Sequence, residues 1–286
     1  MRLYDRLSKK EADDFALVLL SAGVHGFKTV RSDTGWEMHV ADDQGMQAFR
    51  IIEQFRAENR ADPARERDVG PRFHWRWSGV WGALLIACVH LAVYRGGDAR
   101  AFYRVYAASA DRILSGEWHR AATALLLHAD IGHLAANVAG LLIFASAVCS
   151  VAGLGVGWLL VLLSGIAGNM GTAFLYQTDH VAVGASTAVF GAIGLLSTYQ
   201  FTRRIRDRGH RLAAFLPFGA GLALLGFLGA AAHTDVVAHL FGFTAGIALG
   251  FGLPPAAQKA DSRWHQSAAL LLTTAVLALA WLAGIA

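Results

Sequence analysis

From about residue 77 to its end, the chain alternates long apolar stretches with short polar ones. Each stretch is long enough to cross the ~30 Å hydrocarbon layer of a bilayer as a helix that rises about 1.5 Å per residue. We count seven such spans, at about 77–95, 124–149, 153–176, 185–202, 211–231, 236–254 and 266–285. The pattern predicts an all-α polytopic membrane protein.

The first 60 residues follow a different pattern, with shorter elements of mixed polarity. Helical spacing and alternation of period two predict a helix, two strands and a helix, at 11–22, 24–30, 35–41 and 45–58. In the last element, the apolar residues that share one helical face are Ala48, Ile51, Ile52 and Phe55. These elements predict a small α+β domain over residues 1–60. The polar segment 61–73, which contains two prolines, predicts a linker.

The composition agrees with this division. Hydrophobic residues make up 55% of the chain and charged residues 16%, whereas about a quarter of the residues in soluble domains are charged. Residues 1–77 alone hold 13 of the 25 Lys and Arg residues and 13 of the 21 Asp and Glu residues. The apolar content excludes a disordered chain, and two cysteines exclude a disulfide scaffold. The net charge of +4 is too small to indicate nucleic-acid binding.

Lys and Arg residues beside the spans predict the orientation of the chain. Nine of them lie on the side of the N-terminus, and five lie on the other side, all in loop 95–122. Because positive charge favours the cytoplasmic side, the N-terminus is predicted inside. The first residues lack the apolar stretch of a cleavable signal peptide, so domain 1–60 is expected in the cytoplasm. Loop 95–122 is expected to lie along the outer membrane interface.

Three predicted spans begin with polar side chains at their outer ends. His128, His133 and Asn137 lie at the start of the second span, Ser186 at the start of the fourth, and His239 one turn into the sixth. Polar groups inside a membrane are costly in free energy, so they are candidates for function. The predicted topology places all of them at a similar depth.

These residue types fit acyl transfer. A serine hydroxyl becomes a good nucleophile when a histidine accepts its proton, and the oxyanion that forms needs positioned hydrogen-bond donors. Ser186 and His239 fit the nucleophile and the base, and His133 and Asn137 fit the oxyanion donors. They therefore predict a serine hydrolase site near the outer face of the membrane.

Glycines provide a way for the fourth and sixth spans to meet. After His239, small residues repeat at intervals of four positions, at Gly242, Gly246 and Gly250. Such a stripe lets two membrane helices approach closely. Gly184 lies in the turn just before Ser186, and Phe190 lies one turn after it, where its ring would reach the imidazole of His239.

Three motifs in this order, HADIGHLAAN, GASTAVFG and AHLFGFTAG, carry a family resemblance. Over about residues 74–254 the chain resembles the rhomboid intramembrane serine proteases. The resemblance implies a six-helix core that cuts transmembrane segments of membrane-protein substrates near the outer face, with no cofactor. The implied roles are nucleophile for Ser186, base for His239, oxyanion-hole side chain for His133 and Asn137, structural support for His128, and stacking on the base for Phe190.

The chain departs from the family pattern at three places. Thr187 follows the nucleophile where the family usually has glycine, and Phe241 replaces the usual second glycine after the base. His119 separates Trp118 from Arg120, which are usually adjacent. Thr187 is expected to crowd either the helix interface or the oxyanion site. A catalytically inactive rhomboid-like protein that binds transmembrane clients is therefore the alternative.

Other functions fit the sequence less well. A zinc enzyme is disfavoured because the chain has no His-Glu-x-x-His motif and no cysteine pair. A transporter is disfavoured because the two halves show no inverted repeat. His180, at a span end, is expected to be solvated. Asp235, one turn outward from His239, receives no role because the family works without a third carboxylate.

Together these features predict a 6+1 arrangement in a membrane. The six-helix catalytic core covers 74–254, and a cytoplasmic loop and a seventh transmembrane helix cover 255–286. The basic inner loops favour a bacterial cytoplasmic membrane, with the N-terminus inside. The expected partners are the lipid bilayer and transmembrane protein substrates, with no nucleic acid and no bound metal.

Overall fold

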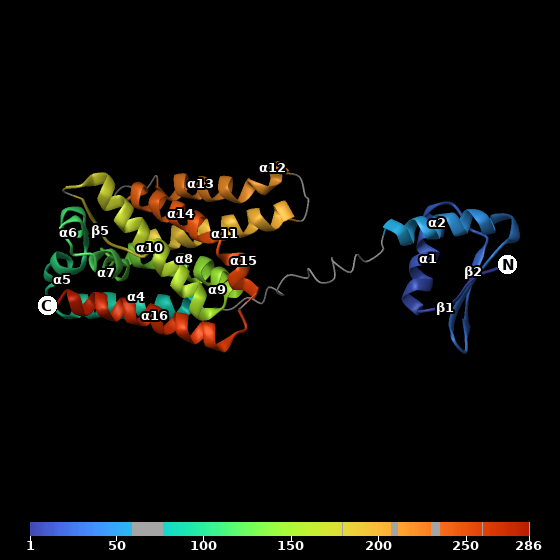
Figure 1. Cartoon of the computed structure of the whole chain (residues 1–286), viewed down its shortest axis with the longest axis horizontal. Coiled ribbons are helices and arrows are strands. Elements are labelled where there is room, and N and C mark those ends of the chain that lie inside the picture. The colour runs from blue at the N-terminus through green and yellow to red at the C-terminus, as the bar shows by residue number, and fades with distance from the viewer. Residues whose placement is uncertain (59–76, 179, 207–210, 230–234, 259, 286) are drawn as a thin grey trace. The chain divides into compact units, whose positions relative to one another are not determined.

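The computed structural model describes residues 1–58, 77–178, 180–206, 211–229, 235–258 and 260–285 (Figure 1). The predicted linker 61–73 lies outside the described residues. The chain is mostly helical, at 75%. It divides into an N-terminal unit, Met1–Gly70, and a C-terminal unit, Pro71–Ala286, and each is described by itself.

The N-terminal unit contains a three-stranded antiparallel sheet in the order β1-β3-β2 and two helices. Its elements are β1 (Arg2–Leu7), α1 (Lys9–Ser21), β2 (Phe27–Ser32), β3 (Gly35–Val40), η1 (Asp42–Gln44) and α2 (Gly45–Glu58). Leu19, Met38 and Ile52 are fully buried where α1, the sheet and α2 meet. Helix α1 begins with a reciprocal cap, in which Ser8 and Glu11 each accept the backbone N–H of the other.

Strand β1 was not predicted from the sequence. Its pairing with β3 shifts register between Arg2 and Tyr4 and again between Tyr4 and Leu7. Arg6 has a positive φ of 53°. These irregularities break the alternation of buried and exposed side chains, and that alternation is the signal by which a half-buried strand is recognised.

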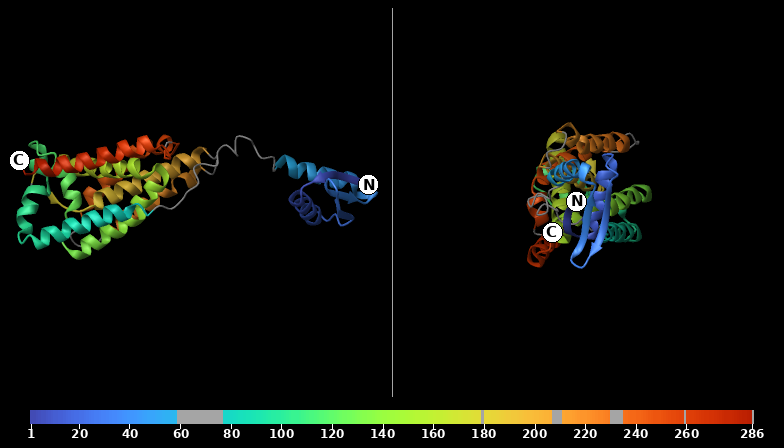
Figure 2. Two further views of the ribbon diagram at one scale, coloured as in Figure 1. Left: turned by 90° about the horizontal axis from the view of Figure 1, so that it is seen from below. Right: turned by 90° about the vertical axis from the view of Figure 1, so that its right-hand side faces the viewer.

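The C-terminal unit is built mainly from helices that run side by side (Figures 1 and 2). Its elements are α4 (Gly79–Arg95), α5 (Ala99–Tyr106), β4 (Ala108–Ser109), α6 (Ala110–Leu114), α7 (Arg120–Thr123), η2 (Ala124–Leu126), α8 (Ile131–Gly140), η3 (Leu141–Ala145), α9 (Ser146–Ala152), α10 (Leu154–Tyr176), β5 (Val181–Ala182), α11 (Ser186–Arg206), α12 (Arg211–Ala214), α13 (Leu216–Gly229), α14 (Val236–Gly250), α15 (Leu253–Gln258) and α16 (Arg263–Ala283).

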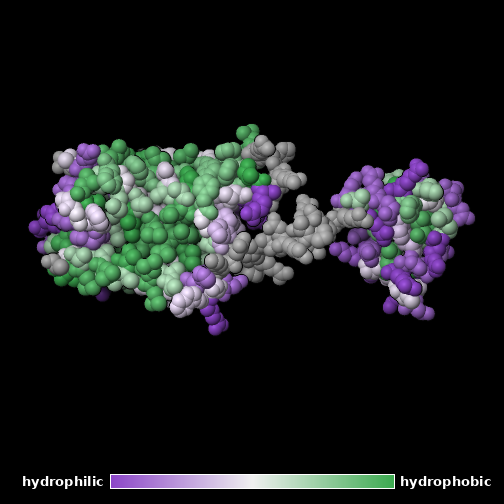
Figure 3. Space-filling model, in the orientation of Figure 1, coloured by the Kyte–Doolittle hydropathy of each residue, from purple (hydrophilic) through white to green (hydrophobic). Residues whose placement is uncertain are grey.

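The surface of this unit suits a bilayer. Hydrophobic residues cover the middle of the face shown in Figure 3, and hydrophilic residues gather at both ends. By length and apolar character, three helical segments of the described residues are able to cross a membrane, at Ile131–Ala152, Leu154–Tyr176 and Arg263–Ala283. Shorter apolar helices lie at Gly79–Arg95, Leu212–Phe227 and Val236–Gly250.

Two of the seven predicted spans are broken well inside their predicted bounds. The predicted span 124–149 begins with η2, is extended at Leu127, and resumes as α8 after Asp130, whose side chain caps the new helix. The predicted span 211–231 is divided into α12 and α13 just before Pro217. Proline is tolerated in the first turn of a helix but not in its interior, so a new helix begins there.

Helices α10, α11 and α14 form the centre of the C-terminal unit. All residues of α11 from Thr187 to Leu195 are buried. Helices α11 and α14 touch through backbone atoms, because a Cβ atom on Gly246 would overlap the carbonyl oxygen of Gly191, and one on Gly194 would overlap that of Phe243. The predicted glycine stripe therefore joins the helix that begins at Ser186 to the helix that carries His239.

Loop 95–122 is folded against the helices. Tyr106 at the end of α5 packs on Trp281 of α16, with ring centroids 4.2 Å apart. Arg120 is buried, donates from Nη1 to the carbonyl of Ala107 at 3.1 Å, and pairs through Nε with Glu117 at 2.6 Å. The hydrogen bond from Arg120 holds the pKa of the Glu117 carboxyl below its ordinary value.

Replacing Arg120 with alanine should therefore destabilise the protein by about 1–3 kcal/mol, because a buried carbonyl loses its donor. The matched control is Arg112→Ala, since Arg112 is exposed and lies 3.4 Å from the same Glu117. An exposed pair of this kind contributes about 0–1 kcal/mol. The melting temperature in detergent measures the loss of stability in each of the two variants. Equal melting temperatures for the two variants would contradict the prediction.

The pair of Arg120 and Glu117 also predicts how the stability of the protein depends on pH in the acidic range. The folded-state pKa of Glu117 is lowered, so its contribution to stability is present above the ordinary value of 4.5 and is lost as the pH falls through the lowered value. The stability difference between the wild type and Arg120→Ala should therefore narrow as the pH falls below 4.5.

Candidate active site

Ser186 is the first residue of α11, and an unusual turn leads into it. Gly184 in this turn has a φ of 123°, which side chains other than glycine rarely adopt. A Cβ atom there would lie 2.6 Å from Cε1 and Nε2 of His133 and 3.6 Å from Oγ of Ser186. Because Gly184 has no side chain, the ring of His133 can lie close to the turn that precedes Ser186.

Two backbone contacts hold this turn. The N–H of Gly184 donates to the carbonyl of Ala124 at 2.9 Å, and the N–H of Ala185 approaches Nε2 of His128 at 3.4 Å. The carbonyl of His128 in turn accepts a hydrogen bond from the hydroxyl of Tyr103 at 2.8 Å. The buried His128 therefore supports the turn and lies behind it, away from the solvent.

His133 and Asn137 lie one turn apart on α8. The side chain of Asp130 caps this helix by accepting the N–H of His133 at 2.8 Å. Asn137 is buried and donates one amide hydrogen to the carbonyl of His133 at 2.9 Å. An amide group has two such hydrogens, so the second is available to another acceptor.

His239 is buried on α14, and its ring stacks on Phe190. The ring centroids are 4.6 Å apart and the planes are inclined by 23°. Phe190 lies one turn after Ser186, so the stack places the imidazole beside the first turn of α11. Among the described residues no hydrogen bond joins Ser186 to His239, and Nδ1 of the imidazole has no partner. Catalytic hydrogen bonds are often long in unliganded enzymes and tighten with substrate.

Thr187 lies at the helix interface. It is buried, and its Cγ2 methyl lies 3.0 Å from the position that a Cβ on Gly242 would take. A Cβ on Gly168 of α10 would meet the same methyl. The glycines on two neighbouring helices thus leave the space that the threonine side chain fills.

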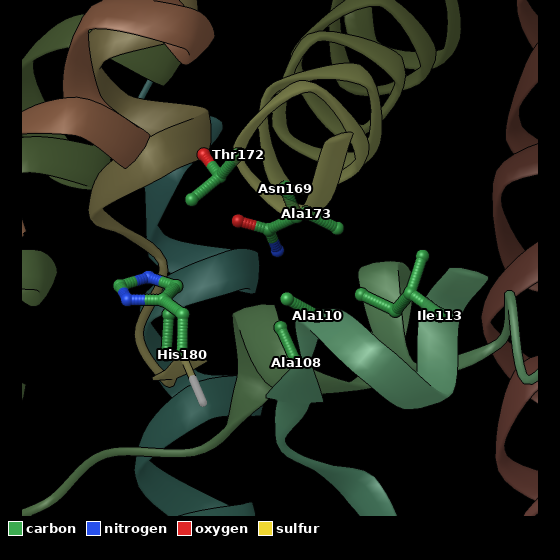
Figure 4. Close-up of a pocket in the computed structure, with 8 residues that line it drawn as sticks. Ala108, Ala110, Ile113, Asn169, Thr172, Ala173 and His180 are labelled. Carbon is green, nitrogen blue, oxygen red and sulfur yellow. The ribbon is translucent and has the colours of Figure 1, made fainter. Parts of the chain in front are cut away.

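Two concave regions of the C-terminal unit lie elsewhere. An apolar groove of about 400 Å³ runs between α4 and α16, and neither Ser186 nor His239 lines it. A small pocket beneath β4 and β5 is bordered by Asn169, Thr172 and His180 (Figure 4), and it is too narrow to enclose a water molecule. In the described part of the chain, no three His, Cys, Asp or Glu side chains are grouped to hold a metal ion.

One pair of residues beside the candidate site was missed from the sequence. His180 Nε2 lies 2.7 Å from Oδ2 of Asp235, and the His180 ring stacks on Tyr176 with centroids 4.1 Å apart. The expectation that His180 is solvated holds only in part, since its side chain is 21% exposed and also packs against these two partners. The partners are 55 positions apart in the sequence, so no local pattern signals their contact.

Comparison with known proteins identifies the family. The Rhomboid domain model matches residues 115–256. "Putative rhomboid protease YdcA" of Bacillus subtilis (strain 168) is 34% identical over 142 residues, which cover 49% of this chain and 69% of that protein. "Rhomboid protease GluP" of the same organism is 32% identical over 169 residues, covering 57% of this chain and 32% of that protein.

A plant relative shows the same similarity. "RHOMBOID-like protein 9, chloroplastic" of Arabidopsis thaliana is 33% identical over 153 residues, covering 52% of this chain and 34% of that protein. The chain thus spans about a third of the length of GluP and of the plant protein, and about two thirds of YdcA. With its apolar helices and this matched domain, the chain is an integral membrane protein and belongs to the rhomboid family.

Proposed function

We propose that the protein is an intramembrane serine endopeptidase that cleaves transmembrane segments of membrane proteins through Ser186 and His239. The observation that carries the proposal is the stack of His239 on Phe190, one turn after Ser186. Two relatives are named as rhomboid proteases, which supports the same reaction. No cofactor takes part in this reaction.

In the proposed reaction, His239 accepts the hydroxyl proton of Ser186 as Oγ attacks a peptide carbonyl of the substrate. The C–N bond then breaks, and the imidazolium gives its proton to the leaving amine. A water molecule hydrolyses the acyl-enzyme, and His239 again acts as the base. Because water must reach the site, the substrate segment is cut close to one face of the membrane.

His133, Asn137 and the backbone N–H of Ser186 are proposed as the oxyanion donors. The contact of the His133 ring with the Gly184 turn supports this role, as does the unused amide hydrogen of Asn137. Such donors stabilise the negative charge of the tetrahedral intermediate, and removal of one typically lowers kcat by about 10²–10³.

For the topology, we propose six core helices over 74–254 followed by a seventh transmembrane helix at α16. The domain over residues 1–60 lies in the cytoplasm of a bacterial cell, and the site opens toward the outer face of the cytoplasmic membrane. Protease accessibility of tags at the two ends of the chain, in oriented membrane vesicles, tests this arrangement.

A covalent probe tests the proposed chemistry without a known substrate. A fluorophosphonate should label the detergent-solubilised protein, and mass spectrometry should place the label on Ser186. Labelling should disappear in His239→Ala, because the hydroxyl is then not activated. A folded wild-type protein that is not labelled at any pH between about 6 and 9 would overturn the proposal and favour a binder of transmembrane clients.

A further inference from the structure

The pair His180 and Asp235 joins the two chain segments that carry the proposed nucleophile and base. His180 begins the segment 180–185, which leads directly into Ser186. Asp235 is the N-cap of α14, and His239 follows one turn later. The hydrogen bond of 2.7 Å between them therefore links the segment before the nucleophile to the helix of the base.

Segment 180–185 has other contacts, and they reach different elements. The carbonyl of His180 accepts the N–H of Ala110, and β5 pairs with β4 in the outer loop. The N–H of Gly184 donates to the carbonyl of Ala124. Among the hydrogen bonds of the described residues, only the bond between the side chains of His180 and Asp235 connects this segment to the start of α14.

The carboxylate of Asp235 serves two partners at once. Its Oδ1 accepts the N–H of Ala238 at 2.9 Å and so fixes the side chain to the first turn of α14. Its Oδ2 is thereby directed to His180. Among the described residues, Nδ1 of His239 has no partner, so Asp235 does not form a triad with His239, although it lies only one turn away. Asp235 instead connects the first turn of α14 to segment 180–185.

The His180 ring is itself held in place. It stacks on Tyr176 at the end of α10, with the planes inclined by 11°. The side chains of His180 and Asp235 are 21% and 22% exposed, so water reaches the pair only in part. Figure 4 shows the His180 ring near Thr172 of α10, where a pocket of small residues borders it. The stack on Tyr176 thus holds the imidazole in the orientation in which it contacts the carboxylate.

His239 depends on the position of its helix. Its Nδ1 has no partner among the described residues, so no hydrogen bond at this atom orients the ring. The helix is fixed on one side of His239 by the backbone contact of Gly242 with Thr187. On the other side, about 6 Å outward at 1.5 Å per residue, it is fixed by Asp235. The two contacts therefore hold α14 in place on both sides of His239 along the helix.

We propose that His180 and Asp235 are positioning residues, which set the separation of Ser186 and His239 by closing the outer end of the contact between segment 180–185 and α14. The inference rests on the proposed protease function. Loss of the pair should affect the chemical step more than substrate binding, because the substrate helix need not touch either residue.

Substitutions at Asp235 separate capping from the link to His180. Asp235→Asn keeps an oxygen for the cap and an amide hydrogen for a neutral imidazole, so both contacts are retained. Asp235→Ser keeps the cap, since serine is a good N-cap residue, but is too short to reach His180. His180→Ala removes the link alone. Asp98→Ser is the matched control, because Asp98 caps α5 in the same way without a second partner among the described residues.

We expect His180→Ala and Asp235→Ser to lower kcat and the rate of fluorophosphonate labelling at Ser186 by about 10–100-fold, because a displacement of about 1 Å has an effect of this size. The KM and the melting temperature should change little. Asp235→Asn should stay within about threefold of the wild type and Asp98→Ser within about twofold, which are differences below about 1 kcal/mol. Wild-type rates in both His180→Ala and Asp235→Ser would overturn the proposal.

A distance measurement tests the link independently of activity. Spin labels at the exposed residues Val181 and Val236 report the separation of the two segments, after Cys88 and Cys149 are replaced with alanine. His180→Ala should broaden and lengthen the distance distribution, and an unchanged distribution would overturn the link. If His180→Ala changes the distance distribution but the wild-type protein is not labelled by the fluorophosphonate, only the protease function is contradicted.

Discussion

Replacing Ser186 with alanine should lower the rate of cleavage of a transmembrane substrate by at least about 10³-fold. Removal of the nucleophile abolishes the covalent route, and the residual rate comes from binding and oxyanion stabilisation alone. His239→Ala should have a loss of similar size, because the serine is then a poor nucleophile. The double variant should be no slower than either single variant, since two residues that act as one unit are strongly non-additive.

The measurement is the initial rate of cleavage in reconstituted vesicles, with each variant first shown to be folded by its melting temperature. Ser164→Ala is the matched control, because Ser164 is also buried in a membrane helix but donates to the carbonyl of Val161 in its own helix. It should keep at least half of the wild-type rate, a change of about 0.4 kcal/mol in activation free energy. Persistent cleavage in Ser186→Ala, or additive losses in the double variant, would contradict a Ser186–His239 dyad.

Much of the candidate site was predictable because its signals are local in sequence. Residue type and spacing predicted that Ser186 begins a helix, that Phe190 reaches the ring of His239, and that glycines line the face of α14. The structure gives the ring stack and the close helix contact as geometry. The catalytic roles of these residues stay predictions that the cleavage experiments test.

Features that depend on distant contacts were not predictable. The link from His180 to Asp235 joins residues 55 positions apart, and each one alone resembles an ordinary polar residue at a span end. The break at Leu127 was hidden because residues 124–127 are all apolar and resemble the start of a continuous membrane helix, although His128 and Asp130 follow them. Hydropathy measures whether a segment suits lipid, and it does not detect where the backbone leaves the helix.

Thr187 illustrates how a local departure depends on its surroundings. From the sequence, a threonine next to the nucleophile was expected to crowd either the helix interface or the oxyanion site. The structure places its methyl group at the interface, between Gly168 and Gly242. Because these two glycines leave the space for a larger residue, the threonine does not by itself argue for an inactive protein. It also makes the packing at Gly242 tight.

Replacing Gly242 with leucine should therefore cause the second large loss of activity. A Cβ atom there would overlap the carbonyl oxygen of Thr187, which belongs to the backbone of α11 and is unable to rotate away. The two helices must separate, and His239, one turn from Gly242, moves away from Ser186. A displacement of about 1 Å at reacting groups lowers the rate by about 10²-fold, and the overpacked interface destabilises the fold by about 1–3 kcal/mol.

Gly219 on α13 supplies the matched control for this prediction, because no atom lies within 4 Å of a Cβ placed there. Gly219→Leu should keep the wild-type cleavage rate within about threefold, which corresponds to less than about 1 kcal/mol. Gly242→Ala adds only the Cβ, yet that atom already overlaps the Thr187 carbonyl, so its rate should fall between those of the wild type and Gly242→Leu. Unchanged cleavage in Gly242→Leu would mean that the spacing of α11 and α14 does not set the geometry of the site. A graded loss from alanine to leucine, at similar KM, would tie the rate to the distance between the two helices.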